Sequence, residues 1–282
     1  MVRKRGVGMG VKVTYAILIL GAVFALFPFY EMVVDSFKAN SAIYTTHPSF
    51  YPTGIHNVAV NYRDLFRAVP YARNLLNSAV AAIGTTVAVL VVDSLAAFAL
   101  ALYRFRGRSL VFALVIASMM LPIQVTILPL FIEMRFIGWL NTEQSLGVTW
   151  VINGFGIFFL RAYMRSAVPR SLLEAARVDG AGLRACFARI VLPIVRPGLA
   201  AVGLIVFMNV WNDFLWPTIT LTGARSYTVP VALSIVNGNT FGSVLYGAIF
   251  AGATVATIPV VVLFLFAQRY FIAGLTMGAT NE

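Results

Sequence analysis

The stretch Pro169-Arg-Ser-Leu-Leu-Glu-Ala-Ala-Arg-Val-Asp-Gly-Ala-Gly-Leu-Arg-Ala-Cys-Phe-Ala-Arg-Ile-Val-Leu-Pro193 is a basic segment between two long apolar runs, at about 145–164 and 198–221. A helix needs about 20 apolar residues to cross the hydrocarbon of a bilayer, and both runs are that long. The basic segment is therefore expected to be a loop at a membrane surface, with a membrane-spanning helix on each side.

Two short helices are predicted within this loop. Pro169 suits the first position of a helix, and Gly180 together with Gly182 would end that helix. A second helix is predicted over about 183–191, and Pro193 is expected to end it.

Further from the loop, the chain contains the same kind of apolar run several more times. The sequence is 60% hydrophobic and 11% charged, with a mean hydropathy of +0.87, which is too apolar for a soluble core. We predict an all-α membrane protein, with residues 1–282 forming one transmembrane domain. Its six predicted spans are approximately 13–34, 76–102, 110–132, 145–164, 198–221 and 244–267.

The basic residues predict the orientation of the spans. Fifteen of the 21 Lys and Arg residues fall on the side that holds both termini, the 103–109 loop and the 161–197 segment. Short loops rich in Lys and Arg stay in the cytoplasm, so both termini are expected to be cytoplasmic. The amino terminus contributes Arg3, Lys4, Arg5 and Lys12. The net charge of +11 is thus explained by topology, and no nucleic-acid partner is expected.

Several kinds of chemistry are absent from the sequence. The chain has one cysteine, Cys186, and two histidines, His47 and His56, which do not make a disulfide or a metal cluster. No Gly-Lys pair is present, so the chain lacks the phosphate-binding loop of an ATPase. It also lacks a nucleophile–base pair, and no enzymatic activity or cofactor is expected in this chain.

The helix after Pro169 has an apolar side that needs a partner. Such a helix can dock in a groove of another protein. It can equally rest on the bilayer surface, and its periodicity alone leaves both alternatives open.

The identities and spacing of the residues in this loop are more specific evidence than its periodicity. Glu174-Ala175-Ala176, three residues, Gly180, nine residues, Ile190, one residue and Leu192-Pro193 together resemble the EAA signature of ABC importer permeases. This resemblance implies the type I importer permease fold, with 170–193 as the coupling loop that contacts an ATPase subunit. The implied coupling residues are Glu174, Ala175, Ala176, Asp179, Gly180, Ile190, Leu192 and Pro193.

Other stretches resemble the carbohydrate branch of this family, in particular the second permease of maltose-type importers. They include Leu95-Ala-Ala-Phe-Ala-Leu100, Arg104-Phe-Arg-Gly-Arg108 and Trp211-Asn-Asp-Phe-Leu-Trp-Pro217. The resemblance implies a bacterial inner-membrane importer of sugars or oligosaccharides. It also implies a homologous second permease subunit, two ATPase subunits that bind ATP and Mg, and an extracytoplasmic solute-binding protein. The alternative function is a secondary carrier or channel that works without ATP.

Polar residues within the predicted spans have two possible roles. They can line the path of a sugar, or they can hold helices together by hydrogen bonds. The candidates for the path are Gln124, Asn153, Asn209, Asn212 and Asp213, with Thr126 as a further one. Asp93 departs from the carbohydrate-permease pattern, and it is expected either to pair with an arginine such as Arg161 or to sit in a hydrated interior. Because the sequence shows no arginine cluster, a neutral substrate is favoured.

Overall fold

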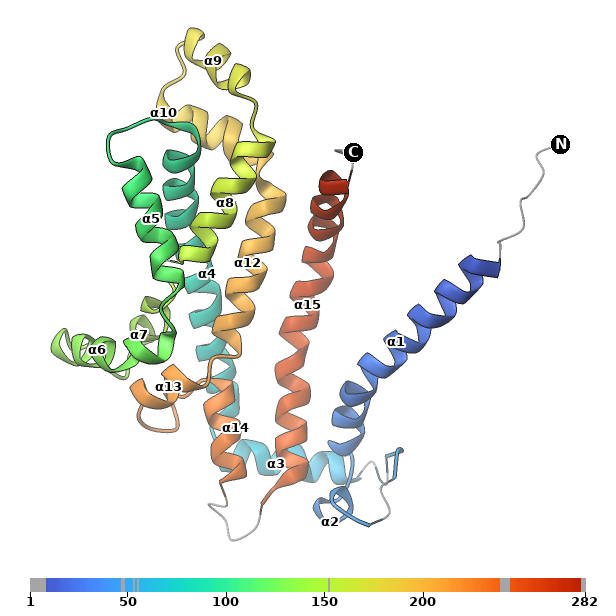
Figure 1. The fold of residues 1–282 in the computed structure, drawn as a ribbon. Coiled ribbons are helices and arrows are strands. Elements are labelled where there is room, and N and C mark those ends of the chain that lie inside the picture. Colours follow the sequence, from blue (N-terminus) through green and yellow to red (C-terminus); the bar gives the residue numbers. More distant parts are fainter. Residues whose placement is uncertain are drawn as a thin grey trace. The chain divides into compact units, whose positions relative to one another are not determined.

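The computed structural model of the chain describes residues 9–46, 49–52, 54, 56–151, 153–238 and 244–279 (Figure 1). Within them it is all helical, as predicted, and the chain divides into two compact units. Unit 1 holds residues up to 69 together with 233–257, and unit 2 holds 70–232 together with the residues from 258 onward. The basic residues Arg3, Lys4 and Arg5, and also His47, lie outside the described residues.

Unit 1 contains α1 (Met9–Asp35), α2 (Asn40–Ile43) and α3 (His56–Ala68). The Asn61 side chain of α3 donates hydrogen bonds to the carbonyl oxygens of Ser36 (2.8 Å) and Lys38 (2.9 Å), which fixes α3 to the end of α1. Lys38 is 2% exposed, and its ammonium group pairs with the Asp35 carboxylate at 2.6 Å. The apolar residues of α1 itself are almost all exposed, as expected for a helix whose solvent is lipid or another membrane protein.

Unit 2 begins with α4 (Tyr71–Leu102) and α5 (Arg108–Met119). The remaining helices of unit 2 are α6 (Ile123–Phe136), α7 (Glu143–Val148), α8 (Gly154–Ala167), α9 (Arg170–Val178), α10 (Leu183–Ala185), α11 (Leu192–Ile194), α12 (Arg196–Trp211) and α13 (Leu215–Thr220). Two further helices, α14 (Val229–Asn237) and α15 (Tyr246–Ala279), contribute residues to both units.

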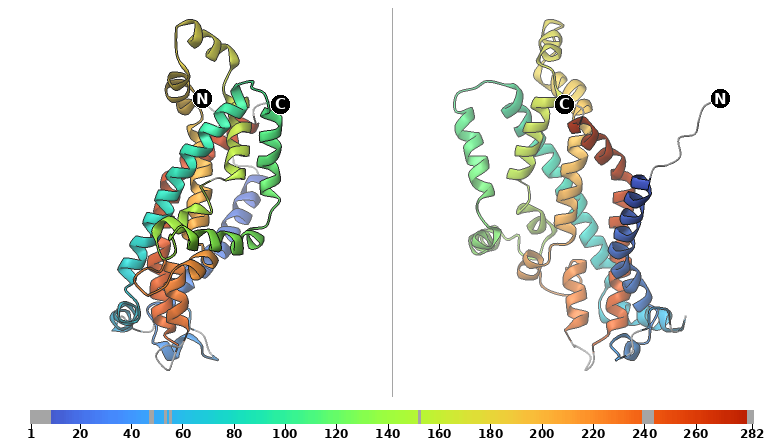
Figure 2. Two further views of the ribbon diagram at one scale, coloured as in Figure 1. Left: turned by 90° about the vertical axis from the view of Figure 1, so that its left-hand side faces the viewer. Right: turned by 45° about the vertical axis from the view of Figure 1, so that its right-hand side comes forward.

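The core of unit 2 is built on α4, which packs most extensively against α8 and α12. Small and β-branched residues at this contact, such as Ala82, Val89 and Val202, are fully buried, so the helices approach closely. The loop with α9 and α10 projects beyond the ends of α4, α5 and α8 in every view (Figures 1 and 2).

The six-span count stays a prediction. Three described helices are long and apolar enough to cross a membrane: Met9–Asp35, Tyr71–Leu102 and Tyr246–Gln268. The number rises to five if each of two bent helix pairs, α5 with α6 and 183–194 with α12, forms one span.

Three of the predicted spans are not continuous helices in the structure. The 110–132 run bends by 101° between α5 and α6, at Pro122, which cannot donate a backbone hydrogen bond. The 145–164 run is split into α7 and α8, and Asn153 caps the start of α8. The 198–221 run breaks after Trp211, where the Asp213 carboxylate accepts the backbone N–H of Trp216 (3.3 Å) at the start of α13.

Candidate functional site

The first candidate site is the loop that carries the predicted coupling residues. Leu173 and Ala176 of α9 are 5% and 9% exposed and join the hydrophobic core of unit 2 with Cys186. Glu174 and Ala175 of the same helix are exposed. The buried residues of α9 therefore hold it on unit 2, and its exposed residues are free to meet another molecule.

Helix α9 ends in a Schellman motif. Gly180 has a φ of +79°, its N–H donates to the Arg177 carbonyl (3.0 Å), and the N–H of Ala181 donates to the Ala176 carbonyl (2.8 Å). The predicted end of this helix at Gly180 is confirmed. Asp179 is the exposed C-cap residue directly before this turn.

The second half of the loop differs from its prediction. Residues Cys186–Val191 form a π-helical segment that continues into α11, so helical structure extends past Pro193 to Ile194 and then bends by 78° into α12. The predicted end at Pro193 is wrong, since the helical structure ends one residue later, at Ile194. Ile190 and Leu192 are half-buried, and Ile190 packs against the core.

Apolar residues on the outward side of the loop strengthen the docking alternative. Val178 is 88% exposed and Leu183 is 62% exposed, on either side of the Gly180 turn. A bilayer surface or a protein groove could cover them. The loop also exposes charges of both signs, among them Glu174, Asp179 and Arg184, and a groove of another protein can pair both signs.

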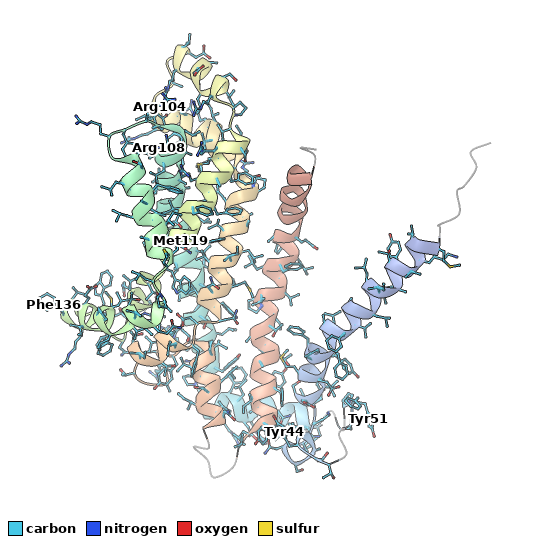
Figure 3. The ribbon with its side chains drawn as sticks, viewed as in Figure 1. Tyr44, Tyr51, Arg104, Arg108, Met119 and Phe136 are labelled. Atoms are coloured by element: carbon cyan, nitrogen blue, oxygen red, sulfur yellow. The ribbon has the colours of Figure 1, made fainter. Side chains whose placement is uncertain are left out.

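Arginines surround Glu174. A cavity of about 470 Å³, which we call the Glu174 cavity, lies between α9 and the end of α4. It is lined by Ala101, Leu102, Tyr103, Arg104, Arg108, Arg170, Leu173, Glu174 and Arg177. Figure 3 shows Arg104 and Arg108 at the end of unit 2 where α9 lies. Among the described residues Glu174 has no ion pair within 4.0 Å, so its carboxylate is available to a partner.

Tyr103 interacts with one of these arginines, Arg177. The Arg177 guanidinium lies 5.0 Å from the centre of the Tyr103 ring. Interaction with the Tyr103 side chain raises the pKa of Arg177 above its usual value, so this positive charge persists at every physiological pH.

The predicted path residues divide into two groups. Asn209, Asp213 and Thr126 come together with Trp216 at a small cavity of about 160 Å³. The others do not line it: the Asn212 side chain donates to the Met208 carbonyl (2.8 Å), and the Asn153 side chain accepts the N–H groups of Phe155 and Gly156. Gln124 is exposed.

Asp93 is buried in the contact between α4 and α8. It is 0% exposed and accepts a hydrogen bond from the Asn153 backbone N–H at 3.4 Å. The hydrated interior stays a prediction. The predicted pairing with Arg161 is wrong. The Arg161 side chain donates to the Leu100 carbonyl (3.2 Å) and lies 3.6 Å above the ring of Phe112.

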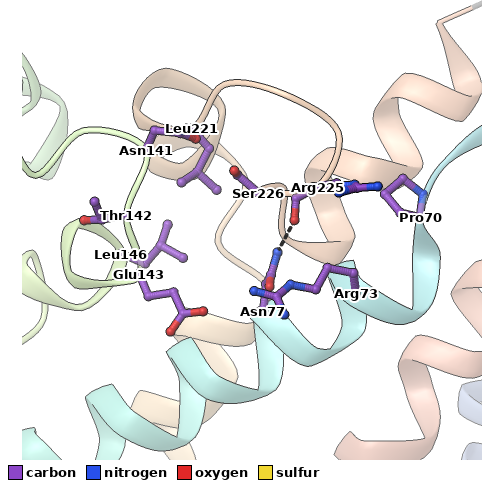
Figure 4. Close-up of a pocket in the computed structure, with 10 residues that line it drawn as sticks. All are labelled: Pro70, Arg73, Asn77, Asn141, Thr142, Glu143, Leu146, Leu221, Arg225 and Ser226. Atoms are coloured by element: carbon purple, nitrogen blue, oxygen red, sulfur yellow. Dashed lines mark hydrogen bonds between the residues drawn. The ribbon is translucent and has the colours of Figure 1, made fainter.

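A second polar site has no counterpart in the sequence analysis. A cavity of about 570 Å³, the Arg73–Arg225 pocket, lies at the end of α4 opposite the Glu174 cavity (Figure 4). Its lining residues are Pro70, Arg73, Asn77, Asn141, Thr142, Glu143, Leu146, Leu221, Arg225 and Ser226. No local pattern could have revealed it, because its three segments are far apart in the chain.

The helical membrane fold and the signature loop at one end are those of a permease subunit of a transport system. The chain belongs to the family described as the inner membrane component of binding-protein-dependent transport systems, whose match covers residues 93–276. This family membership confirms the predicted resemblance and supports the importer function, not the carrier alternative.

Two relatives and one solved structure are similar to this chain. The permease protein AraQ of the arabinooligosaccharides transport system of Bacillus subtilis (strain 168) is 35% identical over 78% of each chain. The permease protein NgcG of the diacetylchitobiose uptake system of Streptomyces coelicolor is 30% identical, covering 94% of this chain and 87% of its own. A bacterial ABC transporter involved in importing the acidic polysaccharide alginate has the same fold, with a TM-score of 0.79 and 23% identity over 92% of this chain and 95% of its own.

Proposed function

We propose that this chain is one permease subunit of an ABC importer for sugars or oligosaccharides. It pairs with a homologous permease, two ATPase subunits bind ATP and Mg on the cytoplasmic side, and an extracytoplasmic binding protein delivers the sugar. The names of the relatives support the substrate class, since they transport arabinooligosaccharides and diacetylchitobiose.

The observation that carries this proposal is the outward side of α9. Its buried side, Leu173 and Ala176, ties the helix to the core of unit 2, so a force on the exposed side would move the unit. Glu174, Ala175, Asp179 and Gly180 are on that exposed surface, while Ile190, Leu192 and Pro193 lie in the second half of the loop. We infer that the ATPase subunit binds the exposed residues of α9 and its turn. The residues in the second half of the loop would then transmit the movement to α12.

The test compares Glu174→Gln with Ser171→Ala in the assembled importer. Both positions are exposed on α9, but only Glu174 presents an unpaired carboxylate. Truncating one side of a desolvated charge pair typically costs about 2–5 kcal/mol, which would lower ATPase retention by more than tenfold. Equal ATPase retention and equal ATP-driven uptake in the two variants would contradict the coupling role.

A second experiment tests orientation. Ser171→Cys on α9 and Thr222→Cys at the Arg73–Arg225 end place labels at the two ends of unit 2. The charge distribution predicts that an impermeant thiol reagent added outside the cell labels Thr222→Cys only. Labelling of Ser171→Cys from outside would reverse the proposed topology. Uptake that survives complete ATP depletion would instead favour a secondary carrier.

Substrate passage is proposed for the smaller group of polar residues that the fold brings together. Asn209 and Asp213 line one cavity beside the aromatic ring of Trp216. Amide and carboxylate groups can hydrogen bond to sugar hydroxyls, and an aromatic face can cover a sugar ring. Three other candidates, Gln124, Asn153 and Asn212, do not line this cavity and are not proposed to contact the sugar.

A further inference from the structure

The Arg73–Arg225 pocket brings together charges from three separate segments. Arg73 comes from the first turn of α4, Arg225 from the loop after α13, and Glu143 from the start of α7. In the view of Figure 4 the two arginines lie toward one side and Glu143 toward the other. Neither arginine has a carboxylate within 4.0 Å among the described residues.

Hydrogen bonds fix the Arg225 loop to α4. The Asn77 side chain donates to the carbonyl oxygens of Arg225 (2.9 Å) and Tyr227 (3.1 Å), and the Asn74 side chain donates to those of Ala224 (2.7 Å) and Tyr227 (2.9 Å). Both asparagines are buried. Buried amides that donate to backbone hold a loop in one conformation, so the position of Arg225 is set before any ligand arrives.

The opposite side of the same loop is fixed as well. The Asn141 N–H donates to the Thr220 carbonyl (2.8 Å), and the Asn141 carboxamide oxygen accepts the N–H of Thr222 (3.0 Å). Asn141 adopts a φ of +60°, a conformation that asparagine tolerates better than most residues. The walls of the pocket are thus built by local contacts in unit 2.

These features point to an anion as the occupant. Two unpaired guanidinium groups with neighbouring amide and hydroxyl groups match a carboxylate, which accepts several hydrogen bonds at once. Both arginines are exposed, and an ion pair between exposed groups contributes little on its own. A free small anion would gain little here, whereas a carboxylate on a protein surface would be shielded from water by the rest of the interface.

We propose that the Arg73–Arg225 pocket receives an acidic side chain from the docking face of the extracytoplasmic solute-binding protein. This inference rests on the proposed function, which places this end of unit 2 outside the cell. Glu143 adds selectivity, because it repels a second acidic group and favours a basic one beside it. The pocket therefore selects a binding protein that presents an acidic residue next to a basic or neutral one.

The experiment measures binding of the cognate solute-binding protein to the complete importer in nanodiscs, at several salt concentrations. The test variant is Arg73→Gln combined with Arg225→Gln. The matched control is Arg135→Gln, an exposed arginine of α6 on the same predicted side that does not line the pocket. We expect the double variant to weaken binding by about tenfold or more, mainly through faster dissociation because the ion pairs are shielded within the interface, and the control to change binding by less than about twofold.

Reversal of charge supplies the second measurement. Arg225→Glu should abolish binding, and a binding protein with one acidic surface residue changed to lysine should restore it. Unchanged binding in the double variant, or equal losses in the double variant and the control, would overturn the proposal. Normal binding with selective loss of uptake for anionic sugars would also overturn it, because the pocket would then recognise substrate. If the unaltered importer neither binds the protein nor responds to it, the proposed function itself fails.

Discussion

The Asp93 carboxylate of α4 accepts a hydrogen bond from the backbone N–H of Asn153, at 3.4 Å, directly before the first turn of α8. The positive end of the α8 dipole therefore faces a buried acidic group. Gly156, one turn into α8, makes this approach possible, since a Cβ atom at that position would overlap Asp93.

Gly156→Ala should destabilise the α4–α8 contact. Overpacking of a buried contact typically costs about 1–3 kcal/mol. We expect the thermal stability of the detergent-solubilised complex to fall by several °C. The measure is the temperature at which half of the complex is still monodisperse. Gly84→Ala is the control, because a Cβ there meets no atom within 4 Å. Equal thermal stability of the two variants would contradict the close contact between Gly156 and Asp93.

Asp93→Asn should be milder than Asp93→Leu. The asparagine keeps an oxygen that accepts the Asn153 N–H, whereas leucine leaves that buried donor unsatisfied, at a cost of about 1–3 kcal/mol. The measurement is the yield and thermal stability of the assembled complex. A leucine variant as stable as wild type would show that this hydrogen bond is dispensable.

Gly180→Ala and Gly182→Ala form a matched pair in the coupling loop. A Cβ atom meets nothing within 4 Å at either position, so only the backbone conformation differs. Gly180 has a φ of +79°, which costs a residue with a Cβ about 1–2 kcal/mol, whereas Gly182 has an ordinary φ of −70°. We expect Gly180→Ala to reduce the ATPase activity stimulated by the binding protein and Gly182→Ala to leave it unchanged. A larger loss of stimulated ATPase activity in Gly182→Ala than in Gly180→Ala would show that the turn at Gly180 is not needed for coupling.

Leu173→Ala should detach α9 from unit 2 without altering its outward surface. Leu173 is 5% exposed and its truncation leaves a cavity, which typically costs about 2–5 kcal/mol, whereas its neighbour Leu172 is 41% exposed. Protease cleavage within 165–197 reports the loosening. Faster cleavage in Leu172→Ala than in Leu173→Ala would contradict this packing.

Asp213→Ala should impair uptake more than Asn212→Ala does. Asp213 lines the cavity with Asn209, whereas the Asn212 side chain bonds within its own helix. Both variants should retain their ATPase subunits. Loss of the assembled complex in Asp213→Ala would assign this residue to helix packing, through the Trp216 N–H that it accepts.

The sequence predicts well what depends on local composition. The long apolar helices and the turn at Gly180 follow from hydropathy and from the conformational freedom of glycine. Hydropathy alone does not locate the breaks at Pro122 and after Trp211, because a value averaged over a window is insensitive to one or two residues that end a helix. The Arg73–Arg225 pocket could not be predicted at all, since Asn77 and the Arg225 carbonyl that it holds are 148 residues apart.

Helix α4 is an unbroken helix of 32 residues, about 48 Å long, and the hydrocarbon core of a bilayer is only about 30 Å thick. Arg73 near one end of this helix lines the Arg73–Arg225 pocket, and Leu102 at the other end lines the Glu174 cavity beside α9. A tilt of about 5° around its midpoint moves both ends by about 2 Å in opposite directions. The two surfaces of the membrane would then be displaced at the same moment, by equal distances in opposite directions, without any change in the internal hydrogen bonds of the helix.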